Sequence, residues 1–254
     1  MNKPQIIMLP GWGMEASVWG LFQDKLSKYF DLSFIEWRGV SSLTCFRERV
    51  IQQIETKIEA ENKSSLILLG WSLGSLVAFE IATRYPSIIN RLIILGGTSR
   101  FIKDESEQYH VGWHRRMVER MKFQLQRDKQ KCLSAFYQSM FSSGEQERGD
   151  HERFLRIVKE KFCGDDTTSL LVGLDYLIQI DLRDKLKLIQ APLLLIHGED
   201  DRICPVSAVQ HISGVVKGSE IKILSGVGHV PFFTSVDECF VTIREFVEKE
   251  QRND

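Results

Sequence analysis

The sequence of 254 residues lacks the features that mark membrane, secreted and nucleic-acid-binding proteins. No apolar run approaches the roughly 18 residues of a membrane-spanning helix, and the apolar stretch near the N-terminus is too short for a signal peptide. The 33 basic and 34 acidic side chains leave a net charge of −1, which excludes a global field for nucleic acid or a membrane surface. We therefore expect a cytoplasmic protein whose electrostatics are local, with neither nucleic acid nor membrane as a partner.

Cysteine pairs and cofactor motifs are also missing. The five cysteines are scattered without a C-x-x-C spacing, and their odd number argues against a disulfide framework. No H-E-x-x-H, G-x-G-x-x-G or G-x-x-x-x-G-K-[ST] phrase points to zinc or to a nucleotide. His110 and His114 are four residues apart, but Gly112 between them weakens a helix that could present both to a metal. We expect reduced thiols, no metal and no organic cofactor.

Short apolar runs alternate with segments of helical periodicity in the first 97 residues and again after the middle of the chain. This alternation is typical of βαβ units and favours a parallel sheet covered on both faces. Strands are predicted over 6–9, 32–37, 66–70, 92–95, 193–197 and 221–224. Helices are predicted over 18–30, 45–61, 73–85 and 236–250.

Between about residues 99 and 168 the pattern changes. No strand-like run occurs there, charges are dense, and apolar residues recur at helical spacing. We interpret this stretch as a helical insertion. The sequence thus predicts one α/β core formed by residues 1–98 and 169–254, interrupted by a helical cap at 99–168.

Gly70-Trp71-Ser72-Leu73-Gly74 is a G-x-S-x-G motif between a predicted strand and a predicted helix. A strand that turns sharply into a helix has little room for a Cβ at the flanking positions and holds the central serine in a strained, exposed conformation. The helix N-terminus favours negative charge beside that serine. The motif predicts a nucleophilic Ser72, although a glycine-rich turn without chemistry would contain the same residues.

A nucleophilic serine needs a base, and the base needs a carboxylate to orient it at the same edge of the sheet. Asp201 follows the fifth predicted strand, three residues after Gly198, and His229 lies in a glycine-rich loop before the last helix. Asp200 is the rival for the acid, but the spacing from Gly198 favours Asp201. We predict a catalytic triad of Ser72, Asp201 and His229.

An oxyanion hole requires two backbone amides fixed near the nucleophile. Leu73, the residue after the serine, supplies one. The turn after the first strand reads Pro10-Gly11-Trp12-Gly13, and the amide of Trp12 is the predicted second donor. A tight turn with a packing tryptophan is compatible with this role.

These phrases resemble the α/β-hydrolase superfamily over nearly the whole chain. Within it, the chain is most similar to the family of pimeloyl-[acyl-carrier protein] methyl ester esterases of biotin synthesis. Pro10 stands where many members carry a histidine, and Ser75 where many carry a third glycine, but neither change removes a catalytic group. The similarity is concentrated at 9–14 with Trp19, 70–74, 173–177, 181–183 and 228–232.

The resemblance implies a serine carboxylesterase that hydrolyses the methyl ester of a pimeloyl chain carried on acyl carrier protein. His229 takes the proton of Ser72, which attacks the ester carbonyl, and the Trp12 and Leu73 amides hold the oxyanion. Asp201 fixes the tautomer of the histidine, and water then clears the acyl-enzyme. No cofactor takes part.

The predicted cap carries a local excess of positive charge, with seven basic and two acidic residues between Trp113 and Lys131. Such a run is either a solvated helix face or a docking surface for an acidic partner. The resemblance implies docking of acyl carrier protein and places the carrier-contacting arginines of the family near Lys131, Ala135, Arg148 and Arg153. Ala135 departs from that pattern, whereas Lys131, Arg148 and Arg153 keep a positive charge.

The resemblance also implies a substrate pocket between cap and core. Its members are expected among the site residues Trp12, Ser72, Leu73 and His229 and along one stretch of the cap. That stretch comprises Phe136, Tyr137, Gln138, Ser139 and Met140. An aromatic stripe at helical spacing is also typical of core packing, so both interpretations stay open.

Other functions are compatible with the same triad, because the cap sets the substrate and one sequence describes a cap poorly. A menaquinone-pathway lyase, a lactonase, a peptidase and a general short-chain esterase are the enzymatic alternatives. A ligand receptor without catalysis is a further alternative, but a receptor has no need of all three triad residues. We expect a monomer.

Overall fold

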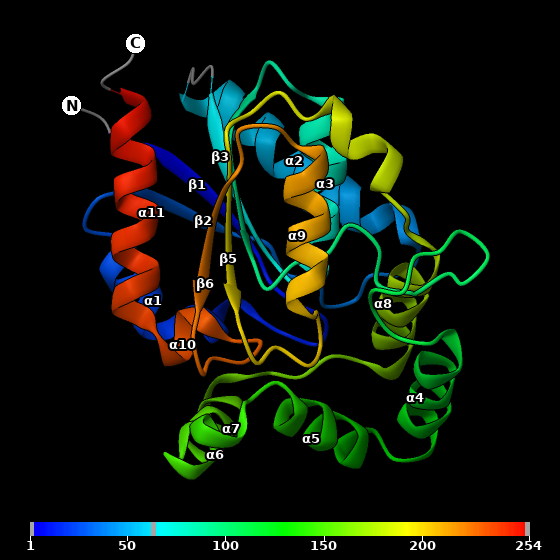
Figure 1. Cartoon of the computed structure of the whole chain (residues 1–254). Helices are drawn as coiled ribbons and strands as arrows, with labels where there is room; N and C mark the ends of the chain where they lie inside the picture. The colour runs from blue at the N-terminus through cyan, green and yellow to red at the C-terminus, as the bar shows by residue number, and fades with distance from the viewer. Residues whose placement is uncertain (1–2, 62–64, 252–254) are drawn as a thin grey trace.

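The centre of the computed structural model, which describes residues 3–61 and 65–251, is a parallel six-stranded sheet (Figure 1). The strand order is β2-β1-β3-β4-β5-β6, and every neighbouring pair is parallel. All strands therefore end at one carboxyl edge. In chain order the strands are β1 (Gln5–Leu9), β2 (Asp31–Phe34), β3 (Leu66–Trp71), β4 (Ile89–Leu95), β5 (Leu193–Gly198) and β6 (Glu220–Leu224).

Helices cover both faces of this sheet. In Figure 1, α1 and α11 lie on one face, and α2, α3 and α9 lie on the other. Every residue of β1, β3 and β5 is buried, as the continuous apolar runs predict, whereas the edge strands β2 and β6 are largely exposed or half-buried. The elements are η1 (Ala16–Trp19), α1 (Gly20–Leu26), α2 (Leu43–Glu61), α3 (Leu73–Arg84), η2 (Arg183–Leu188), α9 (Val206–Val215), α10 (Pro231–Thr234) and α11 (Val236–Gln251).

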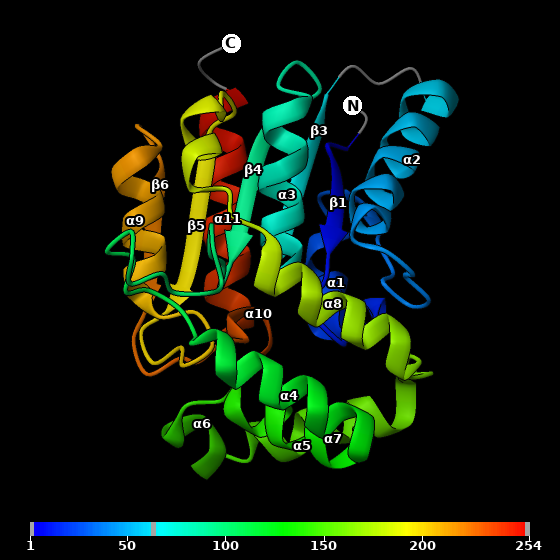
Figure 2. The same ribbon diagram turned by 90° about the vertical axis from the view of Figure 1, so that its right-hand side faces the viewer.

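Five further helices lie between β4 and β5 in the chain. Figure 2 shows α4 to α7 as a layer below the carboxyl edge of the sheet, with α8 running back toward the core. The predicted boundary between cap and core, between residues 168 and 169, falls in the first turn of α8. The assignment of α8 to the core therefore stays a prediction. The bounds are α4 (Arg115–Arg127), α5 (Lys129–Ser139), α6 (Ser143–Glu147), α7 (Asp150–Lys161) and α8 (Thr167–Gln179).

The predicted mostly parallel sheet flanked by helices is confirmed, but two predicted elements are shorter than expected. The second strand ends at Phe34 rather than at residue 37, because Trp37 turns away and donates its Nε1–H to the carbonyl of Pro10 at 2.8 Å. The first helix starts as a 3₁₀ turn and breaks at Gly20, which has a φ of 29°. Helix α9 had no counterpart in the sequence prediction.

Among the residues that the structure describes, no helix is both long enough and apolar enough to cross a membrane.

Candidate active site

Ser72 lies on the turn between β3 and α3 with a φ of 55° and a ψ of −119°, a conformation that costs a non-glycine residue energy. The turn is enforced by close backbone packing on both sides. A Cβ on Gly70 would lie 2.6 Å from the carbonyl oxygen of Gly74, and a Cβ on Gly74 would lie 2.2 Å from that of Leu9. Both glycines of the motif are therefore required sterically, as the sequence suggested.

Ser75, which departs from the family pattern, strengthens this turn. Its hydroxyl donates to the carbonyl of Ser72 at 2.5 Å and accepts from the amide of Thr98 at 3.3 Å. The side chain thus ties the turn to the segment that follows β4. A glycine at this position would make neither bond.

Asp201 is fixed just beyond β5 by three hydrogen bonds. Its Oδ1 accepts from the amides of Ile203 and Cys204 at 2.8 and 2.9 Å, and its Oδ2 lies 2.7 Å from Nδ1 of His229. Asp201 is buried, whereas Asp200 is exposed. The geometry thus places Asp201, and not Asp200, beside the histidine.

His229 is fully buried and is held at three points. Its Nδ1 faces Asp201, its amide donates to the carbonyl of Met140 at 2.7 Å, and its carbonyl accepts from Trp71 Nε1 at 2.8 Å. Its Nε2 has no hydrogen-bond partner within the described part of the chain. This nitrogen is the atom that would accept a proton from a nucleophile.

His197 is a neighbour of the pair that the sequence analysis did not single out. Its Nε2 lies 2.6 Å from the carbonyl oxygen of Cys204 and 3.4 Å from Asp201 Oδ2. Burial lowers the pKa of His197, so the ring is neutral at pH 7. His197 therefore offers no positive charge to Asp201, and His229 is the histidine in closer contact with its carboxylate. The signal was present, because His197 is the one polar side chain in the apolar strand β5.

The turn after β1 adjoins the serine. A Cβ on Gly11 would lie 3.2 Å from the Cβ of Ser72. The indole of Trp12 donates to the carbonyl of Leu170 at 2.8 Å, which anchors the turn to α8. Leu73 is the first residue of α3 and is buried. Leu73 directly follows the serine in the chain and Trp12 follows Gly11, and the role of their amides stays a prediction.

The predicted pocket residues of α5 and its C-cap Met140 face different surroundings. The ring of Phe136 packs edge-on against Trp12 with centroids 5.1 Å apart, and Tyr137 places its hydroxyl 3.4 Å from the carbonyl of Gly13. Gln138 is exposed, and the hydroxyl of Ser139 bonds within its own helix. Met140 is buried and reaches His229 through its backbone. Phe136, Tyr137 and Met140 thus lie closest to the site.

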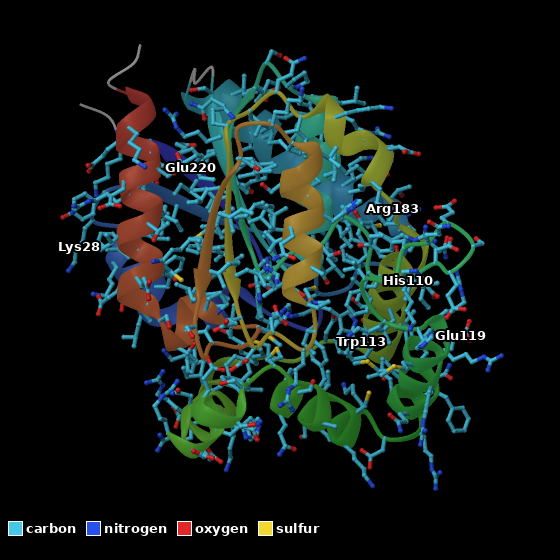
Figure 3. All side chains as sticks on the ribbon, in the orientation of Figure 1. Lys28, His110, Trp113, Glu119, Arg183 and Glu220 are labelled. Carbon is cyan, nitrogen blue, oxygen red and sulfur yellow. The ribbon has the colours of Figure 1, made fainter. Side chains whose placement is uncertain are left out.

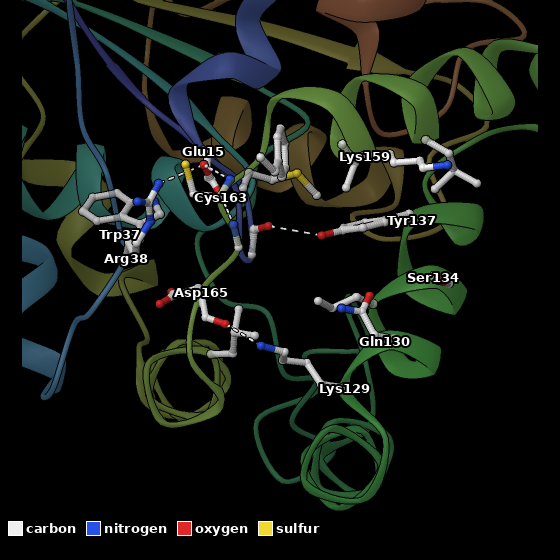
Figure 4. Close-up of a pocket in the computed structure, with 18 residues that line it drawn as sticks. Glu15, Trp37, Arg38, Lys129, Gln130, Ser134, Tyr137, Lys159, Cys163 and Asp165 are labelled. Carbon is white, nitrogen blue, oxygen red and sulfur yellow. Dashed lines mark hydrogen bonds and ion pairs between the residues drawn. The ribbon is translucent and has the colours of Figure 1, made fainter.

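A cavity of about 420 Å³ lies between the cap and the core (Figure 4). Its wall meets the candidate site at Gly13, next to Trp12. Leu133, Tyr137 and Leu170 supply apolar surface. The wall also holds charges of both signs, among them Arg38, which forms an ion pair with Glu15 at 2.9 Å. Lys129 donates to the carbonyl of Asp165 at 2.8 Å, as the dashed line in Figure 4 shows. The cavity could take an apolar chain with polar groups.

The basic residues of the cap differ in whether ion pairs and hydrogen bonds hold them or whether they are exposed. Lys122 forms an ion pair with Asp175 of α8 at 2.5 Å, and Lys129 is bound as described above. Arg153 lies 3.3 Å from Asp150, donates to the carbonyl of Phe233 at 3.0 Å and covers the ring of that residue. Arg148 contacts Asp150 at 3.3 Å but remains more than half exposed. Lys131 is exposed and lines a groove with Arg127 and Ala135.

His110 and His114 do not share a helix. His114 directly precedes α4, and His110 lies in the segment that leads into it, near Trp113 (Figure 3). Over residues 3–61 and 65–251, no group of three or more His, Cys, Asp and Glu side chains is arranged to hold a metal ion.

Comparison with known proteins finds hydrolases and esterases that are similar to this chain. The family model described as serine aminopeptidase, S33, matches residues 38–234. Two curated relatives, from Vibrio parahaemolyticus and Nitrosospira multiformis, are named pimeloyl-[acyl-carrier protein] methyl ester esterase. They are 26% and 27% identical to this chain, and each alignment covers 96% of this chain and 94% of the relative. The solved esterase from Exiguobacterium antarcticum is 20% identical with a TM-score of 0.83, over 97% of this chain and 92% of that one.

Proposed function

The chain belongs to the serine aminopeptidase S33 family, and from this premise we propose that it hydrolyses the methyl ester of a pimeloyl chain carried on acyl carrier protein. The broader class is a carboxylic ester hydrolase, as the sequence predicted. Ser72, His229 and Asp201 are the proposed catalytic residues.

The observation that carries this proposal is a strained serine whose neighbour Trp71 bonds to the backbone of His229, which in turn forms a buried pair with Asp201. Ser72 sits at the carboxyl end of β3 and at the start of α3, and the 2.7 Å contact orients His229 through Nδ1. A histidine fixed in this way presents Nε2 as the basic atom. Both groups lie at the edge where all strands end.

The reaction proceeds in two steps in this proposal. His229 Nε2 removes the hydroxyl proton of Ser72 as its oxygen attacks the ester carbonyl, and the Trp12 and Leu73 amides stabilise the oxyanion. The carbon–oxygen bond to methanol then breaks, with the proton of His229 passing to the leaving oxygen. Water, deprotonated by His229, hydrolyses the acyl-enzyme and regenerates Ser72. Asp201 stays ionised throughout and stabilises the imidazolium.

The cap supports a carrier-borne substrate. The ester lies at the end of the chain remote from the carrier, so the chain must extend from the protein surface to Ser72. The cavity at Gly13 lies between cap and core, and a second groove within the cap, between α4 and α5, adds apolar surface at Met121 and Phe136 for such a chain. A free short-chain ester needs none of this surface.

We place the docking contact for the acidic carrier on the exposed cations of the cap. Lys131 and Arg148 are exposed, and Arg127 beside Lys131 supplies positive charge in the groove that contains Ala135. Arg153 contributes less, because its guanidinium is engaged with Asp150 and Phe233. Complementary charge of this kind steers association and sets specificity.

The test is a direct assay of purified protein. We expect release of methanol from the pimeloyl-carrier methyl ester, with a kcat/KM well above that for p-nitrophenyl butyrate. Cleavage of p-nitrophenyl butyrate without cleavage of the carrier ester would refute the substrate and favour a general esterase, a lactonase or a peptidase. Absence of turnover on every ester would favour a receptor.

A further inference from the structure

The cap contributes one fully buried acidic residue, Glu145, whose carboxylate reaches the loop that carries His229. Glu145 closes a capping box at the start of α6: the hydroxyl of Ser142 accepts from the amide of Glu145 at 3.2 Å, and Glu145 Oε2 accepts from the amide of Ser142 at 2.7 Å. A capping box stabilises its own helix, and its glutamate can do so at the protein surface. The burial of Glu145 therefore calls for another explanation.

The same oxygen makes a second, long-range bond. Glu145 Oε2 accepts from the amide of Gly228 at 3.0 Å, and Gly228 is the residue directly before His229. Ser142 adds a parallel contact, because its hydroxyl donates to the carbonyl of Gly226 at 2.8 Å. Residues 140–145, which we call the strap, thus bind the backbone of residues 226–229 at three points, the third being the bond from His229 to Met140.

The strap and the histidine loop are in direct contact. A Cβ on Gly228 would lie 2.4 Å from the carbonyl oxygen of Met140 and 2.8 Å from Glu145 Oε2. On its other side the loop abuts the end of β5, where a Cβ on Gly198 would lie 2.1 Å from the carbonyl oxygen of Gly228. The loop is therefore held between strand and strap, with no space for a side chain on either side.

We propose that Glu145 is a positioning residue for His229 in the hydrolysis proposed above, on which this inference rests. Asp201 holds the ring at Nδ1 and Trp71 holds the carbonyl, whereas the strap holds the amide and the preceding peptide. Loss of the carboxylate leaves the amide of Gly228 without its acceptor and lets the imidazole drift from the serine. Displacement of a catalytic group by about 1 Å costs on the order of 100-fold in rate.

The experiment compares Glu145→Ala, Glu145→Gln and the matched control Glu147→Ala, whose side chain is exposed on the same helix. Glutamine retains an oxygen that accepts from both amides, so it should rescue the alanine variant. The probes are p-nitrophenyl butyrate and a fluorophosphonate, because neither depends on the natural substrate. All rates are measured at a temperature well below the midpoint of thermal unfolding of each variant.

We expect Glu145→Ala to lower kcat and the labelling rate of Ser72 by 10- to 100-fold with KM little changed, and Glu145→Gln to stay within about 3-fold of wild type. The downfield proton resonance of the His229 imidazole N–H should broaden in the alanine variant alone. Equal kcat and labelling rates in Glu145→Ala and Glu147→Ala would overturn the inference. Failure of the wild type to label would instead refute the proposed function.

Should Glu145→Ala not fold, a second pair of variants gives the same comparison. Ser142→Ala removes a bond to the loop of residues 226–229, whereas Ser143→Ala changes an exposed side chain next to it. We expect a fall in kcat of about 3- to 10-fold for Ser142→Ala. An unchanged kcat in that variant would refute a role for the strap.

Discussion

The carboxyl edge of the sheet and the outer surface of the cap differ in how tightly they are packed. At the edge, backbones pack so closely that a single added Cβ on Gly70, Gly74 or Gly198 would meet main-chain atoms. On the cap, Met117 and Phe123 of α4 are 52% and 64% exposed beside several exposed cations. The edge leaves side chains no alternative position, whereas the cap surface leaves them free to meet a partner.

In the proposed function, this difference separates chemistry at the sheet edge from substrate recognition on the cap. Preorganised groups can stabilise a transition state because they do not have to reorganise when charge develops. An exposed, charged and partly apolar surface can instead recognise a macromolecule by complementarity. The strap at Met140 to Glu145 is where the two regions meet, since it belongs to the cap in sequence and to the edge in packing.

The largest effect should follow a change at the edge that keeps its shape. Asp201→Asn removes the charge that orients and stabilises the imidazolium of His229, and we expect a loss of about 10⁴-fold in kcat at pH 7.5. Asp200→Asn is the matched control, because Asp200 is the neighbouring residue and is exposed. It should change kcat by less than about 2-fold. Equal losses in the two variants would show that the acid has been assigned to the wrong residue.

A second effect concerns the packing of the edge. Gly74→Ala places a Cβ 2.2 Å from the carbonyl oxygen of Leu9, so we expect a loss of about 3 kcal/mol in the free energy of unfolding in urea. Gly214→Ala, in α9 with open space around it, should be neutral or stabilising by about 1 kcal/mol. A Gly74→Ala variant as stable as wild type would mean that the turn is less tightly packed than the structure has it.

The pH dependence of stability provides a third contrast. Burial lowers the pKa of His197 below its unfolded value near 6.5, so the unfolded chain binds the extra proton as pH falls. The contribution of His197 is complete above about pH 6.5 and declines below it by up to about 1.4 kcal/mol per pH unit.

Urea unfolding at pH 7.5 and 5.5 tests this expectation. The decline in stability between the two pH values should be smaller in His197→Asn than in wild type. His114→Asn, at an exposed position directly before α4, should match the wild-type decline. An identical decline in wild type and His197→Asn would contradict the assignment of a neutral buried ring.

The smallest effect is expected on the cap surface. Lys131→Glu should raise KM for the carrier-borne ester by about 3- to 10-fold and leave turnover of p-nitrophenyl butyrate unchanged. Lys28→Glu makes the same charge change on the core, far from the cap (Figure 3), and should alter neither substrate. A matching rise in KM for Lys28→Glu would indicate a global charge effect instead of a docking surface.

The sequence predicted the parts of the molecule in which backbone packing dictates residue type. The glycines around Ser72, the apolar central strands and the spacing of Asp201 after Gly198 each follow from one local constraint. His197 and Glu145 were not found, because their roles depend on contacts with residues distant in the chain. The S-x-x-E phrase at Ser142 is typical of a capping box, a signal that was not used above, but the second bond of Glu145, to Gly228, has no counterpart in local sequence.

The shortened second strand has a similar cause. Residues 32–37 are suitable for a strand, but the indole of Trp37 binds the carbonyl of Pro10 and takes the chain out of the sheet. Tertiary contacts of this kind override local propensity.

The central claim is that Ser72 is the nucleophile activated by His229. It is tested most directly by the intact mass of the protein after treatment with a fluorophosphonate, followed by peptide mapping. We predict a single adduct on Ser72 in wild type and no adduct in Ser72→Ala. Absence of an adduct in folded wild-type protein, or an adduct on another residue, would contradict it.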